Sequence, residues 1–138
     1  MASTAYFNYN VSSSGGTLPS NAPVEDIVKG YLNTSLSVPE VMTQIKDIGK
    51  AFGLQMMSYE AGPGMKVGTK TDLSNVLLAH ADPGMKQVMT SWWKSYGEVF
   101  DVLHQFSLAG YWSRYGAWGA TRILSDTNGP KFSALKEM

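Results

Sequence analysis

The chain has 138 residues, of which 43% are hydrophobic and 16% are charged, and this length and composition are typical of one globular domain with a buried core. The formal net charge is zero, so charge gives no reason to expect nucleic acid or an anionic membrane as a partner. No cysteine is present, which excludes disulfides and thiolate chemistry. No apolar run approaches the ~20 residues of a membrane span, and the first residues lack the features of a secretory signal, so the compartment stays unknown.

The first half of the chain predicts a strand, a long loop and two helices. Weak alternation of apolar residues predicts the strand over residues 4–9, and a run rich in Ser, Gly, Asn and Pro predicts the loop over 11–22. Pro23 begins a helix that reaches about Asn33. A second helix is expected after Ser37, because Glu40 completes a capping box, and to end at Gly53. Its expected core-facing residues are Val41, Ile45, Ile48 and Phe52.

The middle of the chain predicts a buried central strand over residues 54–59, which Gly62, Pro63 and Gly64 then break. After this glycine-rich loop, Thr71 or Asp72 is expected to cap a short helix over 73–79.

The last third predicts a long helix, a third strand and a final helix. Asp82 and Pro83 are a capping residue and a first helical residue, and the apolar stripe that follows extends to about Gln105. The third strand is expected over 106–112, and Pro130 begins the last helix.

This order of elements predicts an α/β fold with three parallel, adjacent strands and helices on one side of the sheet. Three parallel strands leave two open edges, so self-association through these edges is expected.

Glu60 is the first functional candidate, because a carboxylate at the end of a strand and before a Gly-rich turn is where α/β folds place catalytic or binding groups. A solvated loop glutamate is the alternative. Four Trp and seven Tyr suit a protein that stacks on flat, uncharged ligands, although aromatic residues also fill cores. Trp112 is expected beside Glu60 on the parallel sheet, either as a sugar-stacking platform or as a core residue.

Four segments in chain order resemble motifs of the cellulase-like superfamily of (β/α)8-barrel glycoside hydrolases. The segment 59–62 resembles its Tyr-Glu-Gly-Gly element, and 81–85 looks like the Asp-Pro-Arg-Met start of its seventh helix. The segments 115–119 and 129–135 resemble its Tyr-Gly-Ser-Trp-Gly element and the Ser-Pro-Lys-Tyr-x-Ala-Leu start of its last helix. The chain departs from these motifs at Ala61, Gly84 and Ala117, none of which replaces the carboxylate.

The resemblance implies that residues 1–138 are one partial TIM-type barrel domain, units six to eight, from a family that is often secreted. It implies that Glu60 is the catalytic nucleophile of a retaining glycosidase and that the general acid/base lies on strand four, which this chain lacks. Because retaining hydrolysis requires two carboxyl groups ~5 Å apart, the isolated chain is expected to be inactive. The substrate-binding candidates are Tyr6, Asn8, Tyr59, Trp112 and Trp118.

Two kinds of activity stay open at this point. The chain either supplies the strand-seven carboxylate and the stacking aromatics of a glycosidase-type site, or is a non-catalytic carbohydrate-binding or assembly module. An oligosaccharide or polysaccharide is the expected partner in both, with neither nucleic acid nor a membrane. No cofactor or metal is expected, because the two histidines, His80 and His104, lack a second ligand at metal spacing, and His80 is expected at a helix end that favours a cation.

Overall fold

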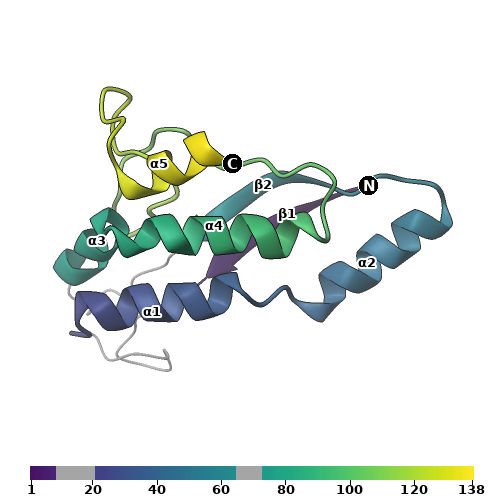
Figure 1. Cartoon of the computed structure of the whole chain (residues 1–138), viewed down its shortest axis with the longest axis horizontal. Coiled ribbons are helices and arrows are strands. Elements are labelled where there is room, and N and C mark those ends of the chain that lie inside the picture. Colours follow the sequence, from purple (N-terminus) through teal and green to yellow (C-terminus); the bar gives the residue numbers. More distant parts are fainter. Residues whose placement is uncertain (9–20, 65–72) are drawn as a thin grey trace.

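A computed structural model describes residues 1–8, 21–64 and 73–138. These residues form an α/β fold in which two strands pair in parallel in an open sheet (Figure 1). The elements in chain order are β1 (Ala2–Asn8), α1 (Val24–Ser35), α2 (Glu40–Ala51), β2 (Met57–Gly64), α3 (Leu73–Ala81), α4 (Gly84–Gly97) and α5 (Pro130–Glu137). The parallel pairing of the first two strands is confirmed. Most of the expected loop over 11–22, and the capping residues Thr71 and Asp72, lie outside the described residues.

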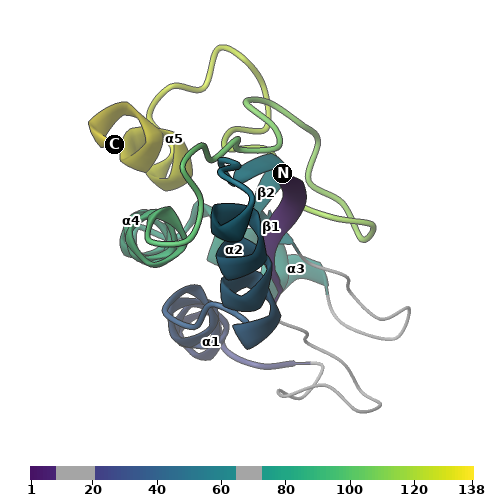
Figure 2. The same cartoon turned by 90° about the vertical axis from the view of Figure 1, so that its right-hand side faces the viewer.

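Helices α1, α4 and α5 lie on one side of the two strands (Figure 2). The core forms where α1 and α4 pack on the sheet, and Phe7 of β1 is at its centre, with its ring centroid 6.1 Å from that of Tyr31 and 5.9 Å from that of Trp92. The Trp92 indole N–H also donates a hydrogen bond to the carbonyl of Ala5, at 3.2 Å, which ties α4 to β1.

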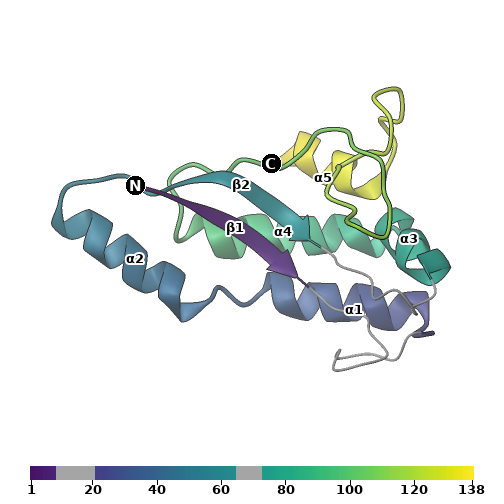
Figure 3. The same ribbon diagram turned by 180° about the vertical axis from the view of Figure 1, so that it is seen from behind.

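The two faces of the sheet follow from the alternation of side chains along β1. Ala5 and Phe7 are buried under the helices, whereas Tyr6 between them is only partly buried and points to the opposite face. A register shift between Ser3 and Thr4 brings Thr4 opposite Glu60. The side chain of Glu60 therefore shares with that of Tyr6 the face of the sheet opposite Ala5 and Phe7. Figure 3 shows the strands from behind, in front of α4.

The predicted bounds of the central strand are wrong, since β2 covers Met57–Gly64 and not 54–59. Gly62, Pro63 and Gly64 do not break the strand but continue it opposite Tyr6, Phe7 and Asn8. Proline is admitted at a strand position whose N–H the ladder does not require, so Pro63 is compatible with the pairing. As a result, Glu60 lies in the middle of β2 and not at its carboxyl end.

The predicted third strand over 106–112 is also not formed. Helix α4 ends at Gly97, and the apolar residues Val99 and Phe100 are buried in the non-helical segment that follows it. The chain then runs beside β2 through isolated parallel bridges from Val102 and Gln105. The predicted end of the long helix, at about Gln105, is therefore wrong. An apolar stripe does not distinguish a helical turn from a buried segment that follows the helix.

Helix α2 differs from its prediction in its packing. Val41, Ile48 and Phe52 are exposed, with 75% of Phe52 accessible, whereas Ile45 packs against the core as predicted. The partly buried Met42, which was not predicted, packs there with it. The capping box is not formed, since no side chain caps this helix.

Three helix boundaries agree with their signals. Gly53 has a φ of 66° after the end of α2, and α5 begins at Pro130. The Asp82 carboxylate accepts a hydrogen bond from the N–H of Gly84, at 2.8 Å, at the start of α4.

Candidate functional site

The candidate site is built on a contact between the two strands. The hydroxyl group of Tyr6 on β1 donates a hydrogen bond to Oε2 of Glu60 on β2, at 3.4 Å, and both side chains are partly buried. The parallel register positions them, because Thr4 pairs with Glu60 and Tyr6 with Gly62. The structure thus brings together two of the candidate residues of the sequence analysis, Tyr6 and Glu60.

The environment of Tyr6 makes its phenol a durable hydrogen-bond donor. Burial, followed by the charge of Glu60 and the hydrogen bond to it, raises the pKa of Tyr6 to about 12. The phenol therefore keeps its proton across the physiological pH range. A neutral phenol that donates to a carboxylate holds that carboxylate in one orientation and leaves its second oxygen available to a ligand.

Gln105 completes this face of the sheet and was missed by the sequence analysis. Its amide nitrogen donates to the carbonyl oxygens of Phe106, at 2.9 Å, and Trp118, at 3.0 Å. A Cβ atom at Gly62 would lie 2.4 Å from Gln105 Oε1, so the glutamine side chain lies directly against β2, two residues beyond Glu60. No motif marks this glutamine, because the cross-chain contact with Gly62 arises only in the folded structure.

The amide oxygen of Gln105 is buried and has no hydrogen-bond partner among the described residues. A buried acceptor without a hydrogen-bond partner lowers the free energy of unfolding, because it has lost its hydration. We use the name Glu60 face for the surface formed by Glu60, Tyr6, Gln105 and Trp118.

The other predicted binding residues lie in varied surroundings. Tyr59 is 59% exposed next to Glu60 in the sequence, and Trp118 is partly buried with its ring 6.4 Å from that of Phe106. Asn8 pairs with Gly64 at the end of β1, and its side chain lies outside what the structure describes.

Trp112 is a buried residue, with 6% of its surface accessible. Its indole N–H donates to the carbonyl of Gly119, at 3.0 Å, and the amine of Lys131 lies 4.3 Å from its ring centroid. In the described part of the chain, no hydrogen bond or ring contact joins Trp112 to Glu60 or Tyr6. The structure thus does not bring Trp112 and the Glu60 face into contact, and the interpretation of Trp112 as a core residue agrees with its burial.

Lys131 and His80 form a buried polar pair that the sequence did not reveal. The Lys131 amine donates to the carbonyl of Ala117, at 2.8 Å, and lies 3.3 Å from Nδ1 of His80. Burial lowers the pKa of Lys131 well below its ordinary value, and burial, with the nearby Lys131 charge, lowers the pKa of His80. His80 lies at the end of α3 as expected, but its burial disfavours the cation that a helix end would favour.

Among residues 1–8, 21–64 and 73–138, no three His, Asp or Glu side chains gather in a geometry that could hold a metal ion. In the same residues, no helix has the length and apolar character required to cross a membrane.

Comparisons with protein-family models, curated proteins and solved structures find no significant match to this chain. The geometry of its own residues therefore carries the functional argument.

Proposed function

We propose that this chain is a C-terminal part of a carbohydrate-active (β/α) barrel, and that it binds an oligosaccharide or polysaccharide on its Glu60 face. The observation that carries the proposal is the hydrogen bond between Tyr6 and Glu60 on the face of a parallel sheet opposite Phe7 and the core. In a closed barrel the helices lie outside and the opposite face of the strands points inward, so this face corresponds to the barrel interior.

The residues of the Glu60 face have the chemistry that sugars require. A carboxylate accepts hydrogen bonds from hydroxyl groups, and an amide oxygen accepts them as well. Aromatic rings pack on the apolar faces of a sugar ring. Glu60 would act as the nucleophile of a complete site, with Tyr6 orienting it. Gln105 and Trp118, together with the exposed Tyr59, would contact the sugar.

The proposal assigns binding, and not bond cleavage, to this chain by itself. Retaining hydrolysis requires a second carboxyl group ~5 Å from the nucleophile to protonate the leaving group, and the proposal places that acid on another strand of the barrel. The expected activity of the purified chain is therefore weak oligosaccharide affinity without turnover.

A binding experiment with paired variants tests this function. The chain is titrated with neutral gluco-, manno- and xylo-oligosaccharides by heteronuclear NMR, as wild type and as Glu60→Gln, Tyr6→Phe and the matched control Glu25→Gln, an exposed carboxylate on α1. We expect saturable shifts on β1 and β2 that weaken in the first two variants and persist in the control. Binding that is equal in all four proteins, or turnover of aryl glycosides that Glu60→Gln abolishes, would contradict the proposal.

An assembly role is a second candidate, because α2 exposes an apolar face. Val41, Ile48 and Phe52 are each more than half accessible on this helix, and β1 pairs only with β2 among the described residues. Exposed apolar surface and an open strand edge both favour association. If a second copy covers α2, Phe52→Ser shifts the chain from dimer to monomer in sedimentation velocity without lowering its melting temperature. A wild-type chain that is monomeric at all concentrations would exclude this role.

A further inference from the structure

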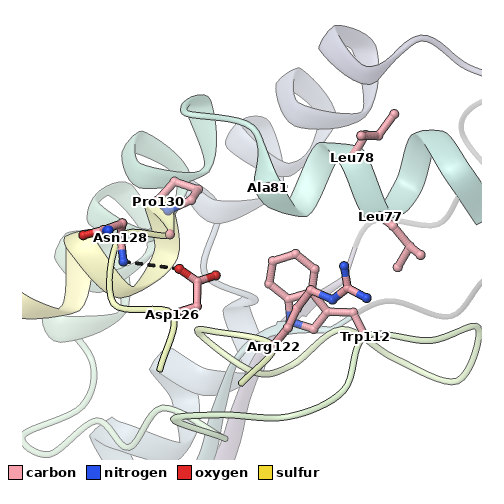
Figure 4. Close-up of a pocket in the computed structure, with 9 residues that line it drawn as sticks. Leu77, Leu78, Ala81, Trp112, Arg122, Asp126, Asn128 and Pro130 are labelled. Carbon is pink, nitrogen blue, oxygen red and sulfur yellow. Dashed lines mark hydrogen bonds between the residues drawn. The ribbon is translucent and has the colours of Figure 1, made fainter. Parts of the chain in front are cut away.

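A pocket of about 430 Å³ lies between α3 and the segment that leads into α5 (Figure 4). It shares no lining residue with the Glu60 face. Its wall is mainly apolar, where Leu77 and Ala81 of α3 face Trp112 and Pro130 across the space. A pocket of this size and character is suited to one small, ring-shaped ligand.

Arg122 supplies a cation at this pocket. The central carbon of its guanidinium lies 5.8 Å from the ring centroid of Tyr111 and 6.0 Å from that of Trp112, so two aromatic rings position the charge. Within the described part of the chain, no hydrogen bond or ion pair joins this guanidinium to another residue. None of the described residues therefore occupies its N–H donors, and a planar guanidinium binds a carboxylate through two parallel hydrogen bonds.

The backbone beside Arg122 is held firmly. Thr121 is buried, its N–H donates to the carbonyl of Leu108, at 3.0 Å, and its own carbonyl accepts from the N–H of Gly110, also at 3.0 Å. The Trp112 ring is fixed by its indole hydrogen bond to Gly119. The cation is thus presented from an ordered scaffold, which limits the entropy lost when a ligand binds.

Asp126 and Asn128 lie at the other end of the pocket, and their side chains can form hydrogen bonds to hydroxyl groups of a ligand. Oδ1 of Asp126 accepts a hydrogen bond from the N–H of Asn128, at 3.3 Å, which leaves its other oxygen and the Asn128 amide at the pocket wall (Figure 4). A carboxylate beside the pocket disfavours a ligand with several negative charges and accepts hydrogen bonds from hydroxyl groups.

We propose that this pocket binds one uronic acid residue, a pyranose ring with a single carboxylate. The carboxylate pairs with the Arg122 guanidinium, the ring hydroxyls bond to Asp126 and Asn128, and the apolar face of the ring packs on the α3 wall formed by Leu77 and Ala81. This site is independent of the proposed role of Glu60, and a free uronate and a chain-linked uronic acid share the chemistry that it recognises.

Calorimetric titration of the full chain with glucuronate, methyl glucuronoside, glucose and inorganic phosphate tests the proposal. We expect glucuronate to bind about tenfold or more tightly than glucose, since one charge-assisted pair distinguishes them. Arg122→Gln should remove that preference, and Arg122→Lys should restore only part of it, because lysine lacks the planar fork. The matched control, Lys29→Gln, removes an exposed cation on α1 and should leave the affinity unchanged.

Each result of the titration either supports one form of the ligand or overturns the proposal. Equal binding of the methyl glycoside supports a site for a chain-linked residue, and binding of glucuronate alone supports a site for the free acid. Phosphate binding as tight as that of glucuronate would overturn the proposal in favour of an unspecific anion site. No saturable glucuronate binding, or equal binding by wild type and Arg122→Gln, would also overturn it. None of these results depends on whether neutral oligosaccharides bind at the Glu60 face.

Discussion

The buried amine of Lys131 predicts an unusual pH dependence of stability. Lys131 is fully buried, its amine donates to the Ala117 carbonyl and contacts the His80 imidazole, and burial lowers its pKa well below the ordinary value of 10.5. Between the folded and the unfolded pKa, the unfolded chain binds a proton at this amine that the folded chain lacks. Stability therefore rises as the pH rises toward 10.5 and is lost as the pH falls toward the folded pKa.

The size of this change in stability follows from a difference of one bound proton between the unfolded and the folded chain. A full difference of one proton changes the free energy of unfolding by ~1.4 kcal/mol per pH unit, so a rise of two units contributes up to ~2.7 kcal/mol. The range from about pH 7.5 to about pH 9.5 suits the measurement, because buried tyrosines oppose the trend at higher pH. Burial raises the pKa of both Tyr31 and Tyr96, so the unfolded chain releases their protons first.

Lys131→Met is the perturbation that isolates this contribution. Methionine has a similar length and cannot titrate, so the stability difference between wild type and variant should change with pH by up to ~1.4 kcal/mol per pH unit. The lost hydrogen bond to Ala117 adds a constant that does not depend on pH, and the slope separates the two effects. Lys136→Met, at an exposed lysine on the same helix, is the matched control and should run parallel to wild type.

Urea unfolding followed by tryptophan fluorescence at several pH values measures these free energies. A wild-type curve that runs parallel to that of Lys131→Met would mean that the folded amine keeps its proton. The argument that burial expels the charge would then be refuted.

Three further outcomes follow from the strands and their contacts. The Tyr6 phenol should titrate near pH 12 by ultraviolet difference absorbance. Glu60→Gln should lower the Tyr6 pKa to a value still above 10.0, since burial is the larger cause of the shift. A Tyr6 pKa that Glu60→Gln leaves unchanged would exclude the contact. Trp92→Phe, which removes the indole hydrogen bond to β1, should destabilise the chain by ~1–3 kcal/mol in urea, and an unchanged midpoint would contradict the packing. Gly62→Ala should destabilise by ~1–3 kcal/mol because its φ is 122° and its new Cβ meets Gln105, and adding Gln105→Ala should relieve only the steric part. Full recovery in that double variant would show that the backbone angle costs nothing.

Part of the candidate site could be predicted from sequence alone. The side-chain contact between Tyr6 and Glu60 depends on two strands joined by helices, and such strands run parallel and lie side by side. Gln105 and the depth of Trp112 could not be predicted in this way. Both depend on how the segment after α4 returns across β2, and this segment carries no periodic pattern.

Local chemistry determined several features before any tertiary contact. The Asp82–Pro83 pair begins α4, Gly53 follows α2 with its positive φ, and alternation along β1 assigns Tyr6 to the face opposite Phe7. These features depend on backbone geometry and hydrogen bonds within a few residues, so neighbouring residues suffice to specify them.

Only the tertiary structure decided where β2 ends, which face of α2 is buried and which lysine amine is buried with a lowered pKa. Pairing with β1 carries β2 through Gly62 to Gly64 although these residues disfavour strands, because ladder hydrogen bonds outweigh weak local preference. The exposed face of α2 and the buried amine of Lys131 likewise depend on which surfaces meet. Burial is a property of distant segments brought together, so no local pattern of residues could reveal it.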